Sequence, residues 1–151
     1  MTRWERWSFN LASLVVAITG FAYFWMKNLL TTDDPFAVVN HPWQEPMLHL
    51  HVLASPFFVL IFGIVLNSHV MKKLRASRVP NRKSGLTSLA TFALMVVSGY
   101  LLQVATDEAW LRGLVSVHVA SGALFSLAYV GHLVVSVRLA RRQQDAIREV
   151  A

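Results

Sequence analysis

Long apolar runs alternate with short polar stretches along the chain, and this pattern predicts a membrane protein. The hydrocarbon core of a bilayer is about 30 Å thick and an α-helix rises about 1.5 Å per residue, so one crossing needs roughly 20 mostly apolar residues. Four runs meet this requirement. We expect membrane-spanning helices over residues of about 9–30, 47–71, 86–103 and 110–138.

The apolar runs are continuous and lack the alternation of a membrane β-barrel, which excludes that fold. The connections between them are short, so consecutive helices should be antiparallel neighbours. The predicted fold is all-α: an integral membrane four-helix up-and-down bundle forming a single transmembrane domain over residues 1–151. No internal repeat stands out in the sequence.

Basic residues gather at those ends of the four runs that would share one side of a membrane. They are Arg3, Arg6, Lys72, Lys73, Arg75, Arg78, Arg82, Lys83, Arg138, Arg141, Arg142 and Arg148. The opposite side carries acidic residues, namely Asp33, Asp34, Glu45, Asp107 and Glu108. Because cytoplasmic ends of membrane helices keep Lys and Arg, we expect both termini to be cytoplasmic.

Composition narrows the function classes. The basic residues behind the net charge of +6 lie next to the ends of the predicted spans, and no RNA-binding pattern accompanies them. We therefore expect contact with anionic membrane lipids and none with nucleic acid. The chain has no cysteine, which excludes disulfides, thiolate metal sites and covalent haem attachment. Any redox metal must therefore be held by histidine.

Histidines are the candidate functional groups. Five of the six lie in or at the ends of the second and fourth predicted spans, which run in the same direction: His49, His51, His69, His118 and His132. Ionisable groups inside a membrane are costly, and they mark functional sites by default. The sixth, His41, falls in the outer loop. We expect its side chain to be exposed and to have no role, and we favour this over a contact with a partner or quinone.

The spacing of these histidines predicts which of them share a helix face. His118 and His132 are 14 residues apart, which returns to nearly the same face about 21 Å along the axis. His51 and His69 are 18 residues apart, five full turns of an α-helix. His49 lies on a different face of the helix from His51. It could be a substitute ligand, contact a quinone or a haem propionate, or extend to the membrane interface as a snorkelling side chain.

Two parallel helices that each offer an outer and an inner imidazole can hold two haems b stacked across the membrane. The expected axial pairs are His51 with His118 and His69 with His132. A single haem is the alternative, because about 27 Å on one helix must match about 21 Å on the other. Cations that would suit the haem propionates are Arg112, Arg138, Lys72 and Lys73.

Small and polar residues near these histidines have two interpretations. The small ones either make room for a macrocycle or reflect ordinary close packing of membrane helices; they are Gly63, Ser121, Gly122, Ala123 and Gly131. Three polar residues are expected to form interhelical hydrogen bonds, namely Asn67, Ser68 and Ser98.

The segment VHVASGALFSLAYVGH, with histidines 14 residues apart, resembles a known family: the four-helix di-haem cytochrome b membrane subunits of bacterial formate dehydrogenases and nickel-iron hydrogenases. In that family one ligand often comes from the first helix, which here has no histidine. In this respect the arrangement is more similar to the cytochrome b of quinol:cytochrome c reductases.

The resemblance implies an electron-transfer subunit of a quinol/quinone oxidoreductase complex in the bacterial inner membrane. It would carry electrons between the quinone pool and a periplasmic c-type cytochrome or oxidoreductase subunit, docked near residues 31–46 and 106–110. The alternatives are a haem-free anchor or scaffold subunit of a redox complex, and a small metal or proton transporter. A transporter would want carboxylates beside the histidines, and no Asp or Glu lies within the predicted spans.

Overall fold

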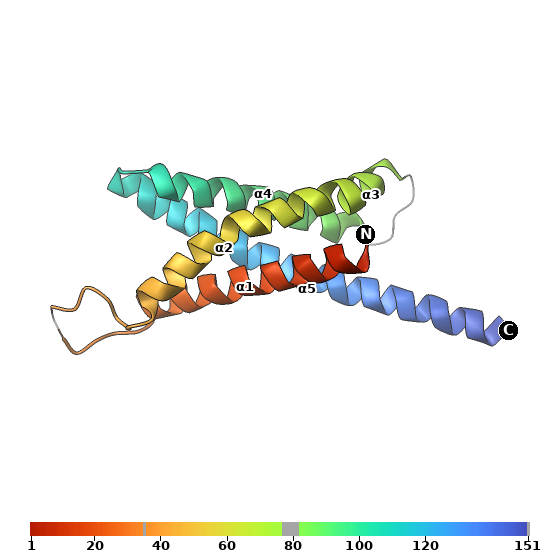
Figure 1. The fold of residues 1–151 in the computed structure, drawn as a ribbon, viewed down its shortest axis with the longest axis horizontal. Coiled ribbons are helices and arrows are strands. Elements are labelled where there is room, and N and C mark those ends of the chain that lie inside the picture. Colours follow the sequence, from red (N-terminus) through yellow and green to blue (C-terminus); the bar gives the residue numbers. More distant parts are fainter. Residues whose placement is uncertain (35, 77–81, 151) are drawn as a thin grey trace. The chain divides into compact units, whose positions relative to one another are not determined.

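The computed structural model describes residues 1–34, 36–76 and 82–150, except the side chains of residues 143, 146, 147, 149 and 150. Arg78, counted above among the inner cations, lies outside the described residues. Helices make up the described fold, and no strand occurs in these ranges (Figure 1). Its elements are α1 (Arg3–Asn28), α2 (Gln44–Val65), the π-helix η1 (Leu66–Val70), α3 (Met71–Arg75), α4 (Arg82–Val104) and α5 (Glu108–Val150).

Four helical segments are long and apolar enough to cross a membrane, which confirms the all-α fold class and the number of predicted spans. They are Arg3–Asn28, Gln44–Arg75, Arg82–Val104 and Glu108–Arg142. The second is continuous through α2, η1 and α3, so the π-helix lies inside a spanning segment.

The helices begin before the predicted apolar runs, and in α1 a capping group determines where the helix starts. At the N-terminus of α1, Thr2 Oγ1 accepts a hydrogen bond from Glu5 N at 3.1 Å, and Glu5 Oε2 accepts one from Thr2 N at 2.9 Å. This reciprocal capping box satisfies two backbone N–H groups. It starts α1 at Arg3, six residues before the predicted span.

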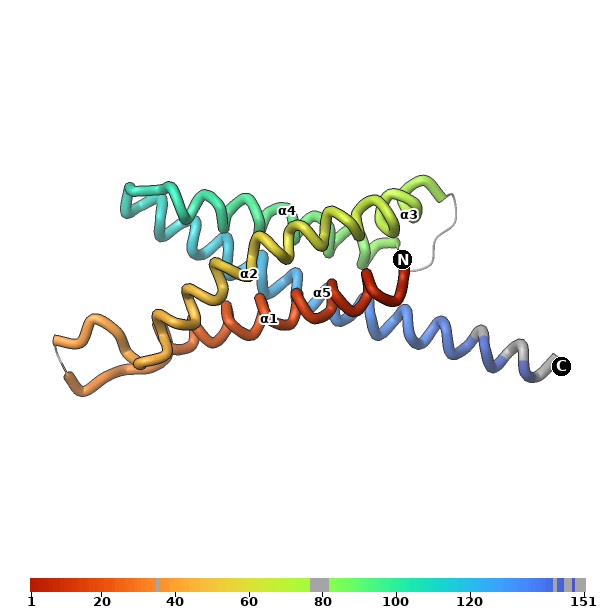
Figure 2. Tube along the Cα trace, in the orientation of Figure 1, coloured from red at the N-terminus to blue at the C-terminus, as the bar shows by residue number. Residues whose placement is uncertain are grey.

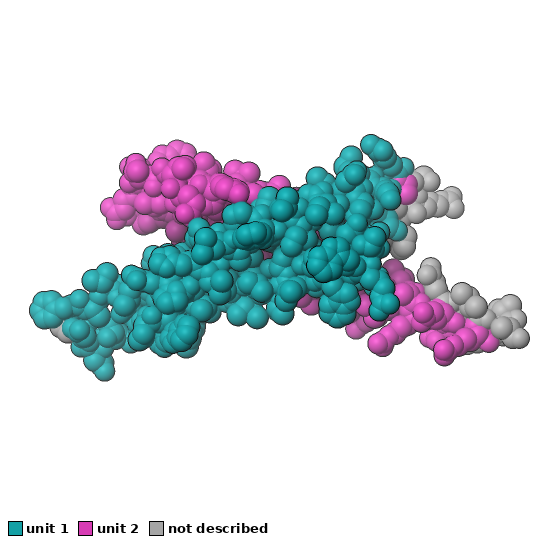
Figure 3. Space-filling view, in the orientation of Figure 1, with its two compact units in different colours: residues 1–75 teal, residues 76–151 magenta. Residues whose placement is uncertain are grey.

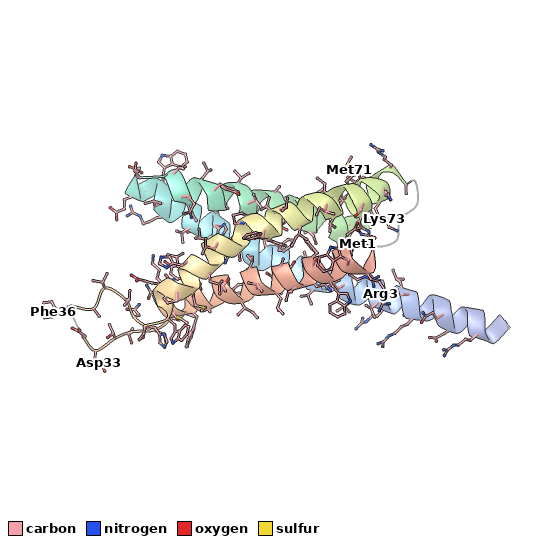
Figure 4. The ribbon with its side chains drawn as sticks, in the orientation of Figure 1. Met1, Arg3, Asp33, Phe36, Met71 and Lys73 are labelled. Atoms are coloured by element: carbon pink, nitrogen blue, oxygen red, sulfur yellow. The ribbon has the colours of Figure 1, made fainter. Side chains whose placement is uncertain are left out.

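The chain divides into two compact units, Met1–Arg75 and Ala76–Ala151 (Figure 3). In the first unit, α1 packs against α2 as an antiparallel hairpin. Met1 and Arg3 lie at the same end of this hairpin as Met71 and Lys73, whereas the loop with Asp33 and Phe36 lies at the other end (Figure 4).

The second unit is also an antiparallel hairpin, in which α5 turns back along α4 after a connection of three residues, 105–107 (Figure 2). The predicted pairing of consecutive helices is therefore confirmed within each unit. Helix α5 has 43 residues, so it is about 65 Å long and continues well past the predicted end at residue 138.

Aromatic residues form the centre of each hairpin. In the first unit, the Phe9 ring lies 5.3 Å from that of Phe58 and 6.1 Å from that of Phe62. In the second, the Phe92 ring lies 5.6 Å from that of Phe125, which stacks on Tyr129 at 5.7 Å. Large apolar side chains also cover the outer faces of the helices, as expected for surfaces that meet lipid.

Each hairpin has a basic end and an acidic end. In the first unit the basic end carries Arg3, Arg6, Lys72, Lys73 and Arg75, and the acidic end Asp33, Asp34 and Glu45. In the second the corresponding sets are Arg82, Lys83, Arg138, Arg141 and Arg142, and Asp107 and Glu108. The same polarity thus arises independently in both units.

The aromatic centre of the first unit predicts that neighbouring phenylalanines differ in importance. Phe58 is 2 % exposed, whereas Phe57 on the next position of α2 is 67 % exposed. We expect Phe58→Ala to leave a cavity that destabilises the protein by about 3–5 kcal/mol, and Phe57→Ala to cost far less because its ring faces outward. Thermal unfolding of the two variants in detergent checks this, and equal midpoints would contradict it.

Candidate histidine sites

His51 of α2 is held against α1 through one ring nitrogen. Its Nδ1 lies 3.0 Å from the main-chain oxygen of Val16 and 3.3 Å from Thr19 Oγ1. The ring also lies against Gly20, where a Cβ atom would come within 2.8 Å of His51 Cε1. No real Cβ makes so close a contact, so only glycine allows the imidazole this position between the helices.

The hydrogen bonds of His51 determine which of its nitrogens carries the proton. A main-chain oxygen only accepts, so Nδ1 must donate to Val16. The Thr19 hydroxyl donates its own proton to the Val15 oxygen at 2.8 Å, which leaves it an acceptor toward the ring. In the neutral form of this ring Nε2 would carry the lone pair, and it is the atom that could coordinate a metal.

His118 of α5 has the same surroundings in the second unit. Its Nδ1 lies 3.0 Å from the Met95 oxygen and 3.3 Å from Ser98 Oγ, and the Ser98 hydroxyl donates to the Leu94 oxygen at 2.8 Å. A Cβ on Gly99 would come within 2.9 Å of His118 Cε1. The predicted interhelical hydrogen bond of Ser98 is therefore confirmed, and Nε2 of His118 is again the nitrogen that could coordinate a metal.

We call this arrangement an imidazole cradle: a Ser or Thr followed by Gly on one helix, with a histidine of the paired helix bound through Nδ1. Sequence reasoning missed Thr19, Gly20 and Gly99, because it searched for small residues on the helices that carry histidines. A signal was present, because Thr19–Gly20 and Ser98–Gly99 are both Ser/Thr–Gly pairs within predicted spans. The two cradles also relate the halves of the chain, although no repeat stood out in the sequence.

His132 occupies a third cradle in the second unit. Its Nδ1 lies 3.1 Å from Ser84 Oγ, and a Cβ on Gly85 would lie 3.6 Å from His132 Cε1, an ordinary contact distance. The structure thus brings His118 and His132 to the same neighbouring helix, α4, as their 14-residue spacing predicts for residues on one face.

His69 has different surroundings, because it lies in the π-helix Leu66–Val70. A π turn holds one residue more than an α turn, which rotates the following residues by about 100°. The prediction that His51 and His69 share a face assumed an unbroken α-helix, and the π-helix that contains His69 departs from that assumption. The neighbouring Ser68 donates a hydrogen bond to Glu5 Oε2 at 2.9 Å, which places this part of the chain against the first turn of α1.

The remaining predicted residues lie in the loop before α2 and on α2 and α5. His49 is exposed, and His41 is partly buried rather than exposed, since its Nδ1 accepts a hydrogen bond from Trp43 N at 3.1 Å. Arg112 is bound to Glu108 at 2.8 Å, with both side chains largely exposed, and Arg138 is exposed on α5. The structure brings none of these four residues to a described cradle.

The glycines singled out from the sequence have no special packing role. A Cβ on Gly63 or Gly131 would meet nothing within 4 Å, and one on Gly122 would make an ordinary contact with Met95 Sδ at 3.6 Å. The glycines that are sterically required lie instead on α1 and α4. Within the described residues, no group of three or more His, Asp or Glu side chains could hold a metal ion together.

Comparison with models of protein families, with curated proteins and with solved structures finds no match to this chain.

The cradles predict a contrast between glycines. Gly99→Ala places a methyl group against the His118 ring and should lower the unfolding temperature of the protein in detergent. Gly131→Ala, on the open side of α5, should leave it unchanged or raise it, because alanine favours a helix over glycine by up to about 1 kcal/mol. A Gly99→Ala protein as stable as the Gly131→Ala control would contradict the cradle.

Proposed function

We propose that this protein is a membrane-embedded b-type cytochrome subunit that transfers electrons across the membrane between the quinone pool and a periplasmic redox partner. The observation that supports it best is the pair of imidazoles of His51 and His118. Each is fixed through Nδ1 on a main-chain oxygen, so that Nε2 is the coordinating nitrogen. Iron-ligating histidines need this second-shell hydrogen bond for orientation and basicity.

The chemistry of the chain fits haem b. Two histidine imidazoles would hold such a haem, and a haem held in this way would supply electron transfer rather than oxygen binding. With no cysteine, covalent attachment through thioether bonds is excluded, which fits a non-covalently bound haem such as haem b. We assign His51 and His118 to the outer haem and His69 and His132 to the inner one, with a single haem as the alternative.

The protein's part in this function is to orient the histidine ligands and to keep water away from them. A haem supplies a carrier that takes up and releases one electron at a time. Val16 and Met95 oxygens fix the planes of the two outer imidazoles, and the aromatic centres at Phe58 and Phe125 keep water from the interior of each hairpin. Fixed ligands change little between oxidation states, which keeps the reorganisation energy low.

The charge polarity of the hairpins supports the proposed orientation. Both basic ends would lie in the cytoplasm with both termini, next to anionic lipids of the bacterial inner membrane. The acidic ends would face the periplasm and the docked partner. Arg138 would pair with an inner haem propionate, whereas Arg112 would have to leave Glu108 to reach an outer one.

The first test is haem content. Protein purified in detergent from a haem-replete host should give a reduced-minus-oxidised spectrum of b type and a pyridine haemochrome value of about two haems per chain. One haem per chain would support a mono-haem cytochrome and remove the inner pair. None would overturn the proposal in favour of the anchor or transporter alternatives.

The outer pairing predicts identical effects from two distant substitutions. His51→Ala and His118→Ala should each lower the haem content by one per chain and remove the same component from a potentiometric titration, because both ligate one iron. His49→Ala is the matched control, since it removes an exposed histidine of the same helix and should keep both haems. Loss of different components in the two variants would contradict the pairing.

The orientation of the protein in the membrane can be tested by cysteine labelling. The natural chain gives no background reaction, because it has no cysteine. Phe36→Cys, at a position 89 % exposed in the outer loop, should react with a membrane-impermeant maleimide in spheroplasts. Lys73→Cys should react only after lysis, because the basic end is expected to be cytoplasmic. The reverse pattern would place the termini outside.

A further inference from the structure

The outer loop of the first unit, residues 29–43, is held at its base by side chains. Asn40 Nδ2 donates a hydrogen bond to the Lys27 oxygen at 3.0 Å, and Asn40 N donates one to Gln44 Oε1 at 3.1 Å. Gln44 is 8 % exposed, so its side chain anchors the loop to the start of α2. The two ends of the loop are therefore tied together, and the rest of the loop projects from this base.

The far end of the loop presents an aromatic side chain to water. Phe36 N donates a hydrogen bond to Asp34 Oδ1 at 2.9 Å, and Ala37 N donates one to the Asp34 oxygen at 3.2 Å, which makes a turn. Phe36 is 89 % exposed and Val38 is 95 % exposed. Figure 4 shows Phe36 at the tip of the loop, away from both helices of the hairpin. Burying this ring against another surface would be favourable, because apolar area would leave water.

Acidic residues flank the ring, and their charge is not compensated. Asp33 and Asp34 precede Phe36, and Glu45 lies in the first turn of α2. Among the described residues, none of these three carboxylates takes part in an ion pair. Between positions 7 and 71 the sequence has a single Lys or Arg, Lys27, whose Nζ donates to a tyrosine hydroxyl at 3.1 Å. The loop end thus combines an exposed aromatic ring with negative charge.

These features favour one kind of partner. Protein interfaces have an apolar centre with aromatic anchors and a polar rim. A basic protein surface would complement the carboxylates, whereas the phosphates of anionic lipids or of nucleic acid would be repelled. The length of the loop also supports a role in binding, because helix–helix connections usually have about 2–8 residues and longer ones are often functional. The second unit closes its hairpin with residues 105–107 alone.

We propose that this loop end is the docking site for the periplasmic redox partner, and that the partner is a basic protein with an apolar patch surrounded by lysine or arginine side chains. The Phe36 ring packs against the apolar patch, and Asp33 and Asp34 pair with the surrounding cations. Docking is then steered by charge and anchored by one aromatic residue. The inference rests on the proposed function, which supplies the reason for a periplasmic partner.

The experiment measures the binding of mitochondrial cytochrome c, a small basic haem protein, to the purified protein in phosphatidylcholine nanodiscs. The affinity should fall as the salt concentration rises, and it should be lost when the lysines of the cytochrome are acetylated. Phe36→Ala should weaken binding roughly tenfold or more, because it removes the aromatic anchor. Phe57→Ala is the matched control, since this phenylalanine is 67 % exposed but lies in a spanning helix, and it should leave the affinity unchanged.

A second pair of variants separates charge from loop structure. Asp34→Asn removes the negative charge but keeps the side-chain oxygen that accepts from Phe36 N, so the turn should persist while the affinity falls. Asp145→Asn removes the same charge from an exposed position near the C-terminal end of α5, and it should bind as the unaltered chain does.

Three results would overturn the docking site while leaving the proposed function intact: no binding of the cytochrome at low salt, equal binding of the acetylated cytochrome, or equal affinities of Phe36→Ala and Phe57→Ala. A loop that rests on the bilayer would overturn it as well, and a fluorophore on Phe36→Cys would then be blue-shifted in the discs before any cytochrome is added. Failure of the proposed function is recognised separately, because the haem content of the same preparation is measured without a partner.

Discussion

An imidazole N–H inside a bilayer must find an acceptor, and the surroundings of the histidines in this protein follow from that requirement. Burying an unsatisfied donor in hydrocarbon costs several kcal/mol, of order 4–8 by transfer to an alkane. The acceptors within reach are main-chain oxygens of the adjacent helix, which already serve that helix's own hydrogen bonds. Val16 and Met95 each accept a further bond from a histidine. An imidazole comes this close to another helix's backbone only where a residue without a side chain makes room, which explains Gly20 and Gly99.

The same requirement explains the hydroxyl residue beside each glycine. Thr19 and Ser98 donate to oxygens of their own helix one turn back, so they need no outside acceptor and present a lone pair to the ring. Each Nδ1–H is consequently surrounded by acceptors alone, which favours the tautomer in which Nε2 could coordinate a metal. This preference arises before any metal binds.

The sequence predicted the four spans because bilayer thickness sets the length of an apolar run, and it predicted the candidate histidines because ionisable groups are rare in such runs. It did not locate the helix ends, which depend on caps such as Thr2 and Glu5. Nor did it identify Gly20 and Gly99, whose importance comes from a ring on another helix rather than from their own neighbours. The π-helix at Leu66–Val70 was not predicted either, because nothing in the sequence LNSHV distinguishes a π turn from an α turn.

That interruption bears on how electrons would move. Under the proposed function, the outer haem has two equivalent imidazoles, each bound to a main-chain oxygen, whereas the inner one combines a histidine facing a serine hydroxyl with one in a π turn. Second-shell hydrogen bonds to axial ligands are among the means by which a protein sets a haem's reduction potential. Two haems with identical surroundings would have equal reduction potentials. The direction of electron flow would then depend only on the quinone and the partner. Unequal surroundings would give the two haems different reduction potentials. In this protein the difference would arise because the first hairpin departs from the pattern of the second.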